Sequence, residues 1–239
     1  MIDVASTMVT VGVAVGRIRD TREVPRLRIT RSPVRVVDYR ACVGAGACGV
    51  PALRTAPCAG GVGEGTRATY AAEHDHDDMA VTCVTPKQAR EYCAWVGGRL
   101  PNAEEWLVAA RGDGIRRYAW GNEPPRCDHH PRALTNGQSG GECCGTECNT
   151  LAPYRVGAHS LNVAPSGMQD VLLTEGELIG LEATSSLSTC TGTAGACVAR
   201  GMEAAAIDGF VAIPEDPGPD DYKGYVPDYS FRCVSEVSR

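Results

Sequence analysis

The segment from residue 81 to 122 constrains the fold most, because the sequence specifies both ends of two helices in it. The first helix is predicted to begin after Thr85. Pro86 suits the first helical position, and Gln88 can complete a capping box with the Thr85 hydroxyl. The helix is predicted to end at Gly97-Gly98. Its apolar residues recur at helical spacing and predict one buried stripe, formed by Ala89, Tyr92, Cys93 and Val96.

The second helix follows after the short linker 99–101, so the two helices are expected to be neighbours in space. Asn102 is the predicted N-cap, Glu105 closes a second capping box, and Gly112 marks the end. The predicted buried face consists of Ala103, Trp106, Leu107 and Ala110. A turn at Trp120-Gly121-Asn122 then leads out of the segment.

The overall composition narrows the possible partners. The chain has 239 residues, 43% of them hydrophobic, which suits a single domain spanning residues 1–239. A net charge of −6 and the lack of a Lys/Arg-rich run argue against a nucleic-acid partner. No apolar run approaches the roughly 20 residues that a membrane helix needs. Residues 1–15 lack the basic start of a signal peptide.

Twelve cysteines, an even number lying mainly in predicted loops, indicate a disulfide framework. Such a framework is typical of an extracytoplasmic or secreted protein. Cys42 and Cys48 bracket a short loop, and either one local bridge or two longer bridges fit them. A second interpretation is a tetrahedral zinc site, but the spacing matches no standard finger and disulfides are favoured. Its candidate ligands are Cys127, His129, His130, Cys143, Cys144 and Cys148.

The remaining regular structure is sparse. Residues 8–16 are predicted to form a strand that enters a turn. The alternation of Leu27, Ile29, Val34 and Val36 predicts a half-buried strand, followed by a short helix over residues 39–42. Residues 49–80 are expected to be a surface loop. Within it, the run Glu73-His74-Asp75-His76-Asp77-Asp78 has metal-binding residue types, but it is interpreted as a solvated acidic loop.

The segment 81–122 resembles the formylglycine-generating enzyme (sulfatase-modifying factor) family. That family reads V-x-C-V-x-W-x-x-A-x-x-Y-C-x-W, then R-L-P-T-E-A-E-W-E-x-A-A-R-G and Y-x-W-G. Matching residues are Val81, Cys83, Val84, Ala89, Tyr92, Cys93, Trp95, Arg99, Leu100, Pro101, Glu105, Trp106, Ala109, Ala110, Arg111, Gly112, Tyr118, Trp120 and Gly121. The resemblance implies an α+β fold, the family's variant of the C-type lectin fold. Two framework helices, small antiparallel sheets and disulfide-rich loops are then expected.

The resemblance continues on both sides of that segment. Glu23-Val24-Pro25 fits the family's opening, and residues 156–171 resemble V-G-S-x-x-x-N-x-x-G-L-x-D-M. Residues 229–233 match the closing G-F-R-C strand, with Ser230 in place of Gly. A structural role is therefore expected for Arg99, Glu105, Trp106, Arg111, Trp120, Arg232 and Cys233. Cys197 is the first choice as the disulfide partner of Cys233.

The family's catalytic segments differ in this chain. Its enzymes convert a sulfatase cysteine to formylglycine with oxygen and a copper(I) ion held by two cysteines, which follow R-G-G-S. Residues 180–186 lack R-G-G-S, and the candidates Cys190 and Cys197 have six intervening residues instead of four. The family's G-N-V-W-E-W, which supplies structural calcium ligands and a pocket tryptophan, is replaced by Leu173-Thr174-Glu175-Gly176-Glu177-Leu178.

These differences predict a non-catalytic member of the family that presents variable loops, mainly residues 180–227, to a protein or small-molecule ligand. Candidate binding residues are Glu182, Thr184, Ser185, Ser186, Asp208, Phe210, Tyr222 and Tyr225. The alternative is a copper-dependent oxidase using Cys190 and Cys197, although a structural role for both is favoured. A third hypothesis is an iron-dependent tailoring enzyme using His129 or His130. Trp106 and Trp120 are expected in the core rather than as pocket walls, and His159 is expected in a loop.

Overall fold

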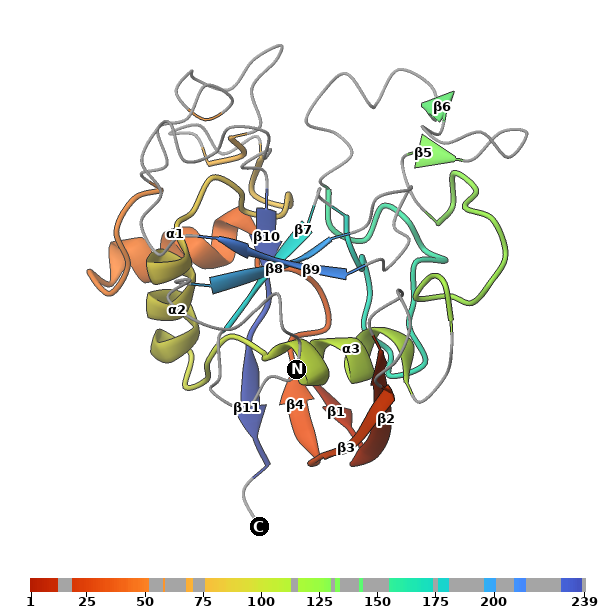
Figure 1. Cartoon of the computed structure of the whole chain (residues 1–239). Coiled ribbons are helices and arrows are strands. Elements are labelled where there is room, and N and C mark those ends of the chain that lie inside the picture. The colour runs from red at the N-terminus through yellow and green to blue at the C-terminus, as the bar shows by residue number, and fades with distance from the viewer. Residues whose placement is uncertain are drawn as a thin grey trace.

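The computed structural model describes most of the framework and part of the loops. Described residues are 1–12, 19–51, 58, 68–70, 76–112, 116–129, 132–133, 142–143, 155–173, 176–180, 196–200, 209–213 and 229–237. Among these residues, short helices and short strands are joined by long connections (Figure 1).

The two predicted helices are confirmed, together with their caps. Helix α2 (Pro86–Trp95) begins with a capping box in which the Gln88 N–H donates to Thr85 Oγ1 at 3.2 Å and the Thr85 N–H donates to Gln88 Oε1 at 3.0 Å. Helix α3 (Ala103–Arg111) repeats the arrangement with Asn102 and Glu105 at 2.8 and 2.9 Å. Each box satisfies backbone donors that the first helical turn leaves without partners.

Two local predictions need correction. A third helix, α1 (Val36–Gly44), covers the predicted short helix but starts earlier, at Val36, where the alternation predicted continued strand. Val36 is buried, as both a strand and a helix would require, so its apolar side chain could not distinguish the two structures. Val96 was predicted to lie on the buried stripe of α2, but it is the C-cap residue and is 39% exposed.

A three-stranded sheet joins distant parts of the sequence. Its order is β1 (Ile2–Val4), β4 (Leu27–Ile29), β11 (Val234–Glu236), with antiparallel pairing throughout. The predicted strand at Leu27 and Ile29 is confirmed, and both side chains are buried. Two small antiparallel hairpins lie outside this sheet: β2 (Thr7–Gly12) with β3 (Arg19–Val24), and β5 (Arg132–Ala133) with β6 (Glu142–Cys143).

A four-stranded sheet forms the second layer of strands. Its order is β10 (Tyr229–Phe231), β7 (Gly176–Ile179), β8 (Ala196–Arg200), β9 (Gly209–Ile213). The pairs β7–β8 and β8–β9 are antiparallel, whereas β10 runs parallel to β7. Helix α3 lies on one side of this sheet in Figure 1, between it and β1–β4. β10 therefore belongs to the four-stranded sheet, whereas β11, which follows it closely in the sequence, belongs to the three-stranded sheet.

Three disulfides are described: Cys42–Cys48, Cys58–Cys83 and Cys93–Cys233. The first shows that the local bridge is the correct alternative for Cys42 and Cys48. The third shows that Cys197 was the wrong choice for Cys233, whose partner is Cys93 on α2. Cys127 is also disulfide-bonded, which favours the disulfide interpretation of its segment over a zinc site.

The described core has two parts. One packs α3 against β1, β4 and residues 164–172, with Trp106 fully buried. The other packs α1 and α2 around an aromatic cluster, in which the Tyr39 and Tyr92 rings stack at 5.7 Å and Phe231 lies edge-on to both. Among the described residues, no helix combines the length and apolar character needed to cross a membrane.

Candidate functional site

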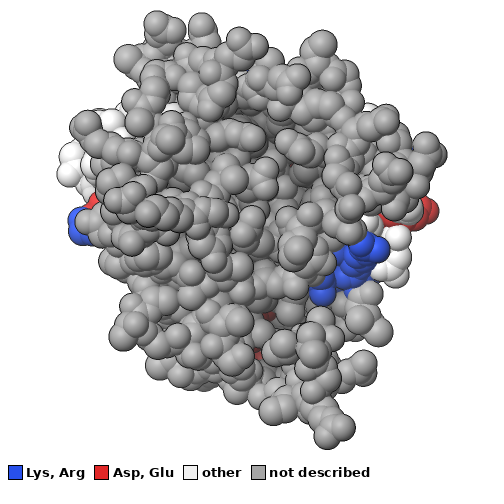
Figure 2. Space-filling view, turned by 45° about the horizontal axis from the view of Figure 1, so that its top comes forward, with Lys and Arg blue, Asp and Glu red and all other residues white. Residues whose placement is uncertain are grey.

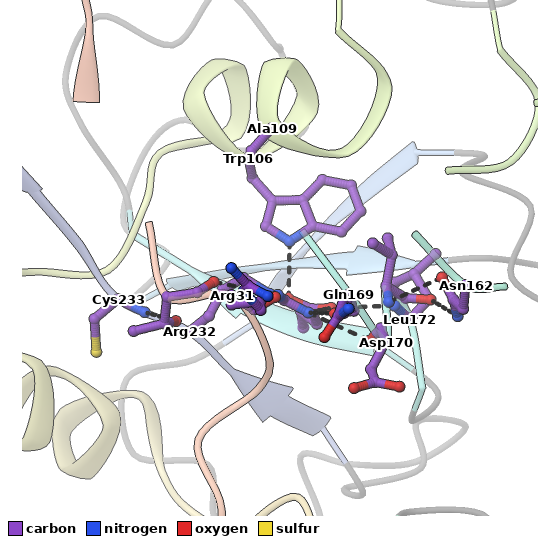
Figure 3. Close-up of polar contacts among 12 residues, drawn as sticks. Arg31, Trp106, Ala109, Asn162, Gln169, Asp170, Leu172, Arg232 and Cys233 are labelled. Carbon is purple, nitrogen blue, oxygen red and sulfur yellow. Dashed lines mark hydrogen bonds and ion pairs between the residues drawn. The ribbon is translucent and has the colours of Figure 1, made fainter. Parts of the chain in front are cut away.

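A buried ion pair connects β7 to Arg232, which lies between β10 and β11. Arg232 and Glu177 are both fully buried, and Arg232 Nε lies 2.5 Å from Glu177 Oε2. The indole N–H of Trp106 donates to the same oxygen at 2.9 Å, pointing from α3 toward the pair (Figure 3). Arg232 also donates to Glu177 Oε1 at 2.8 Å, and the Leu172 N–H donates to that oxygen at 3.1 Å. Glu177 thus accepts hydrogen bonds at both oxygens.

Arg232 uses its remaining donors on backbone carbonyls. It donates to the carbonyl of Arg31 at 3.0 Å, of Gln169 at 3.2 Å and of Asp170 at 3.3 Å (Figure 3). A buried charge is tolerated only when it is paired and hydrogen-bonded, and both conditions hold here. The predicted structural role of Arg232 and Trp106 is therefore supported by their contacts, and Trp106 is not a pocket wall.

Glu177 is a structural residue that the sequence analysis missed. It occupies the position of the glutamate in the family's G-N-V-W-E-W, a segment interpreted above only as replaced. The sequence did contain a signal for this role: Glu177 retains the glutamate of G-N-V-W-E-W, while Gly176 and Leu178 replace the two tryptophans. Since both Glu177 oxygens accept hydrogen bonds and Arg232 lies beside them, this carboxylate does not fit a calcium ligand.

Asp170 lies next to this ion pair. It is buried, its Oδ2 accepts a hydrogen bond from the Gly157 N–H at 3.0 Å, and its Oδ1 has no hydrogen-bond partner. Burial raises the pKa of the Asp170 carboxyl above its ordinary 3.8, while the Gly157 hydrogen bond and the charge of Arg232 act in the opposite direction. Asp170 also has a positive φ of 54°, a conformation that Asp and Asn tolerate better than most residues.

Trp120 is part of a three-ring stack. Its ring lies parallel to Tyr118 at 4.9 Å and close to parallel with His129 at 4.5 Å, and its N–H donates to the Glu123 carbonyl at 3.1 Å. Trp120 packs against the core and stacks on two neighbours but is only partly buried, so the expectation of a core position holds in part.

The same contacts weaken the iron hypothesis for His129. Its Nδ1 accepts a hydrogen bond from the Arg126 N–H at 3.2 Å, so the proton of the neutral ring is assigned to Nε2. Burial and the nearby Arg126 lower the pKa of His129, which favours the neutral ring. With Nδ1 occupied and Nε2 protonated, neither nitrogen offers a lone pair to a metal. His130 lies outside the described residues.

His159, expected in a loop, lies in the 155–173 connection and is buried. Its Nδ1 lies 3.0 Å from the carbonyl oxygen of Cys127. The side chain therefore connects two loop segments that are 32 residues apart.

Arg99 and Glu105 support the connection between the two capped helices. The guanidinium donates to both Glu105 oxygens at 2.6 and 2.7 Å, and Glu105 also accepts from the Asn102 N–H. The backbone of Arg99 exchanges two hydrogen bonds with Val234 at 2.8 and 2.9 Å. Arg111 provides the basic residue in the last turn of α3, where a positive charge suits the helix dipole.

The described part of the acidic run at residues 73–78 makes ion pairs with arginines. Asp77 lies 2.9 Å from Arg40, and Asp78 pairs with Arg155. The described residues 76–78 are therefore half-buried and ion-paired, and less solvated than the interpretation as a solvated acidic loop expects. Within the described residues, no group of three or more His, Cys, Asp or Glu side chains is placed to hold a metal. Residues 73–75 lie outside that part of the chain.

The predicted binding residues lie mostly outside the described residues. This applies to Glu182, Thr184, Ser185, Ser186, Asp208, Tyr222 and Tyr225, and to Cys190. Phe210 and Cys197 are placed by their backbones alone, in β9 opposite Ala199 and in β8 between Ile179 and Ala212. The face in Figure 2 shows described Lys and Arg side chains at its left and right sides. The binding residues and the copper pair therefore stay predictions.

The fold is that of a C-type-lectin-like α+β domain of the formylglycine-generating-enzyme type. The sequence pattern of the sulfatase-modifying factor enzyme 1-like domain matches residues 5–156. This chain belongs to that family, and the resemblance noted in its sequence is confirmed. The matched region ends before β7 and before both copper-ligand candidates.

Named relatives include enzymes and an inactive protein. The chain is 32% identical over 168 residues to a hercynine oxygenase of Mycolicibacterium thermoresistibile, which covers 63% of this chain and 34% of the relative. It is 50% identical over 48 residues to the inactive C-alpha-formylglycine-generating enzyme 2 of Bos taurus, over 19% of this chain and 16% of the relative. It is 44% identical over 62 residues to the formylglycine-generating enzyme of Streptomyces coelicolor, over 25% of this chain and 18% of the relative. The chain thus spans about a third or less of these relatives.

Two solved structures share the fold over nearly the whole chain. PvdO from Pseudomonas aeruginosa superposes with a TM-score of 0.61 at 14% identity, covering 98% of this chain and 93% of that structure. Treponema denticola variable protein 1 gives a TM-score of 0.59 at 13% identity, covering 99% of this chain and 95% of that structure. At these identities, the likeness concerns the fold alone.

Proposed function

We propose that this chain is a non-catalytic domain of the formylglycine-generating-enzyme family, and that it presents its loops over residues 180–227 to a ligand. The observation that carries the proposal is the composition of β7. Glu177, which holds the core together, is retained, whereas Gly176 and Leu178 stand where the family has its tryptophans. The strand has kept the residue that pairs with Arg232 in the core and lacks the tryptophan that lines the pocket in the family.

The sheet around β7 supports a display role. Segments 181–195, 201–208 and 214–228 each connect two of its four strands. The sheet is fixed to the rest of the core by the Glu177–Arg232 pair and by the Gly180 N–H, which donates to the Pro101 carbonyl at 2.8 Å. Loops whose ends are fixed by an ordered sheet have less conformational freedom to lose on binding than loops with free ends. The sheet around β7 therefore suits loops that bind a ligand.

Relatives of this chain include one that is named inactive. Short stretches of the framework match an inactive relative and an active enzyme about equally well. Framework similarity is therefore compatible with either outcome. One protein of this fold is named a variable protein, which is in keeping with variation in loops on a constant core. The disulfides are in keeping with an oxidising, extracytoplasmic compartment.

Copper retention tests the non-catalytic part. The purified protein is mixed with copper(I) and a competing chelator, and then with oxygen and a sulfatase-derived cysteine peptide. We expect neither retained copper nor oxidised peptide, and no difference from a Cys190→Ala/Cys197→Ala variant. The Streptomyces coelicolor enzyme is the positive control. Copper held tightly by the wild type but not by the variant, with peptide oxidation, would establish the copper-dependent oxidase instead.

Binding is tested separately with arrayed glycans and displayed random peptides as probes. We expect one class of probe to bind the wild type and to lose binding to a Tyr222→Ala/Tyr225→Ala variant. An Arg155→Met variant, changed on the framework surface, serves as the matched control and should bind as the wild type does. Equal binding by all three proteins would place recognition outside residues 180–227.

A further inference from the structure

The three disulfides that the structure describes differ in how deeply their cysteines are buried. Cys58 is partly exposed and packs at the margin of the core that contains α1 and α2. The other five cysteines of these disulfides are all buried, namely Cys42, Cys48, Cys83, Cys93 and Cys233. Thiol–disulfide exchange begins when a thiolate attacks one sulfur of the disulfide, so its rate depends on access. The Cys58–Cys83 disulfide therefore offers a thiol its easiest entry among the three.

The backbone on both sides of Cys83 is held by contacts that do not involve the disulfide. The Val81 N–H donates to the Val34 carbonyl at 2.8 Å, and the Thr82 N–H donates to the buried Thr69 Oγ1 at 3.0 Å. Thr85, two residues after Cys83, caps α2 through its own capping box. Opening the Cys58–Cys83 disulfide therefore leaves these contacts in place and requires no unfolding of the framework.

The other two disulfides lack such a local route. Cys93 and Cys233 are both fully buried, and they join α2 to the segment between β10 and β11. Cys42 is fully buried on α1, and its partner Cys48 is also buried. A thiol reaches these sulfur atoms only when the surrounding core opens, which is a rarer event than attack at a partly exposed residue.

We propose that the Cys58–Cys83 disulfide is a redox-sensitive site, opened in the folded protein by a dithiol reductant of the kind that protein oxidoreductases carry. The disulfide closes a loop of 25 residues, and its reduction releases residue 58 from residue 83 while α2 and its cap persist. Exposed disulfides are the labile ones, whereas deeply buried ones are structural. The proposed site lies apart from residues 180–227 and is independent of the proposed binding function.

The chemistry is an exchange of two electrons and two protons. A thiolate of the dithiol attacks Cys58 Sγ, the bond between Cys58 and Cys83 breaks, and its electron pair leaves with Cys83 Sγ, which takes up a proton. The second thiol of the reductant, as its thiolate, then attacks the reductant sulfur of this mixed disulfide. Cys58 leaves as a thiolate and is protonated, and the dithiol becomes a disulfide.

The order of reduction tests the proposal. The folded wild type is treated with limiting dithiothreitol, the new thiols are blocked with N-ethylmaleimide at successive times, and the blocked positions are mapped by mass spectrometry. We expect Cys58 and Cys83 to be labelled together, at least about tenfold faster than the cysteines of the other two described disulfides. The same reaction in concentrated urea is the control, and there the three rates should converge.

A second arm identifies the sulfur that is attacked. Glutathione has a single thiol, so it leaves a mixed disulfide on the cysteine that it attacks. We expect glutathione on Cys58, with the free thiol on Cys83. Glutathione found mainly on Cys83 would overturn the inference, as would comparable rates for the three disulfides in the folded protein.

Paired variants test whether the opening is local. In Cys58→Ser/Cys83→Ser the fast labelling should disappear, while the two remaining described disulfides should keep their slow rates. The matched control, Cys42→Ser/Cys48→Ser, should retain fast labelling of Cys58 and Cys83. If the buried disulfides of the first variant were reduced as fast as in urea, the framework would depend on this bridge and the inference would fail. Neither copper retention nor probe binding enters these measurements, so this inference and the proposed function can fail separately.

Discussion

Arg232 and Glu177 are 55 residues apart in the sequence and form a fully buried ion pair at 2.5 Å. Because Arg232 follows β10 and Glu177 lies in β7, the pair fixes the parallel contact between these two strands. Trp106 adds α3 to the same arrangement. The charges thus specify how one helix and two strands meet.

Replacing Glu177 with glutamine should destabilise the protein by about 3–5 kcal/mol, because Arg232 would remain charged and buried without its counter-ion. Urea unfolding measures the change. The matched control is Arg155→Met, which removes the exposed pair with Asp78 and should cost less than about 1 kcal/mol. The double variant Glu177→Leu/Arg232→Met should cost less than the sum of its single changes, and simple additivity would contradict the coupling.

Gly98→Ala should destabilise the protein, because an added Cβ would lie 2.3 Å from the Val234 carbonyl oxygen, which accepts a hydrogen bond from Arg99. We expect a loss of roughly 1–3 kcal/mol, since a backbone atom cannot yield as a flexible side chain can. Gly44→Ala is the control, with no atom within 4 Å of the added Cβ. A helical alanine there should leave stability unchanged or slightly raised. Equal melting temperatures for the two variants would refute the predicted clash.

Removing the Cys93–Cys233 disulfide should cost more than removing Cys42–Cys48. The former closes a loop of 140 residues and the latter a loop of 6. In the chain-entropy model this corresponds to about 5 and about 2 kcal/mol. The measurement compares paired alanine variants, Cys93→Ala/Cys233→Ala and Cys42→Ala/Cys48→Ala, by chemical unfolding without reductant. The reverse order would show that native contacts, and not loop closure, control the effect.

Asp170→Asn should change how stability depends on pH. Since burial raises the pKa of Asp170 above 3.8, the folded protein binds this proton more tightly than the unfolded chain. The contribution to stability is complete below pH 3.8 and is lost as the pH rises through the folded pKa. The wild type should therefore lose stability relative to Asp170→Asn over that interval. Asparagine also tolerates the positive φ. A stability difference that is constant with pH would contradict this.

Local features were predicted well from the sequence because their causes are local. The capping boxes at Thr85 and Asn102 use residues only three positions apart, and both helices begin where expected. The break at Gly97 follows from its positive φ of 78°. Burial of Tyr92 likewise follows from its place on the apolar stripe.

Features that depend on distant segments were not predictable in the same way. Several cysteines can be drawn to Cys233, and only the position of α2 against β10 selects Cys93. Glu177 looked like part of a lost segment, because its role depends on Arg232, a residue from the end of the fold.

The position of β10 and β11 has a consequence for how this protein is made. Residues 229–236 supply one strand to each sheet, the counter-charge of Glu177 and the partner of Cys93. During synthesis, Glu177 and Cys93 therefore lack their partners until residues 229–236 emerge from the ribosome. Contacts of such long sequence separation slow folding. The core is thus expected to be completed late in folding, and the protein to depend on protection from aggregation until then.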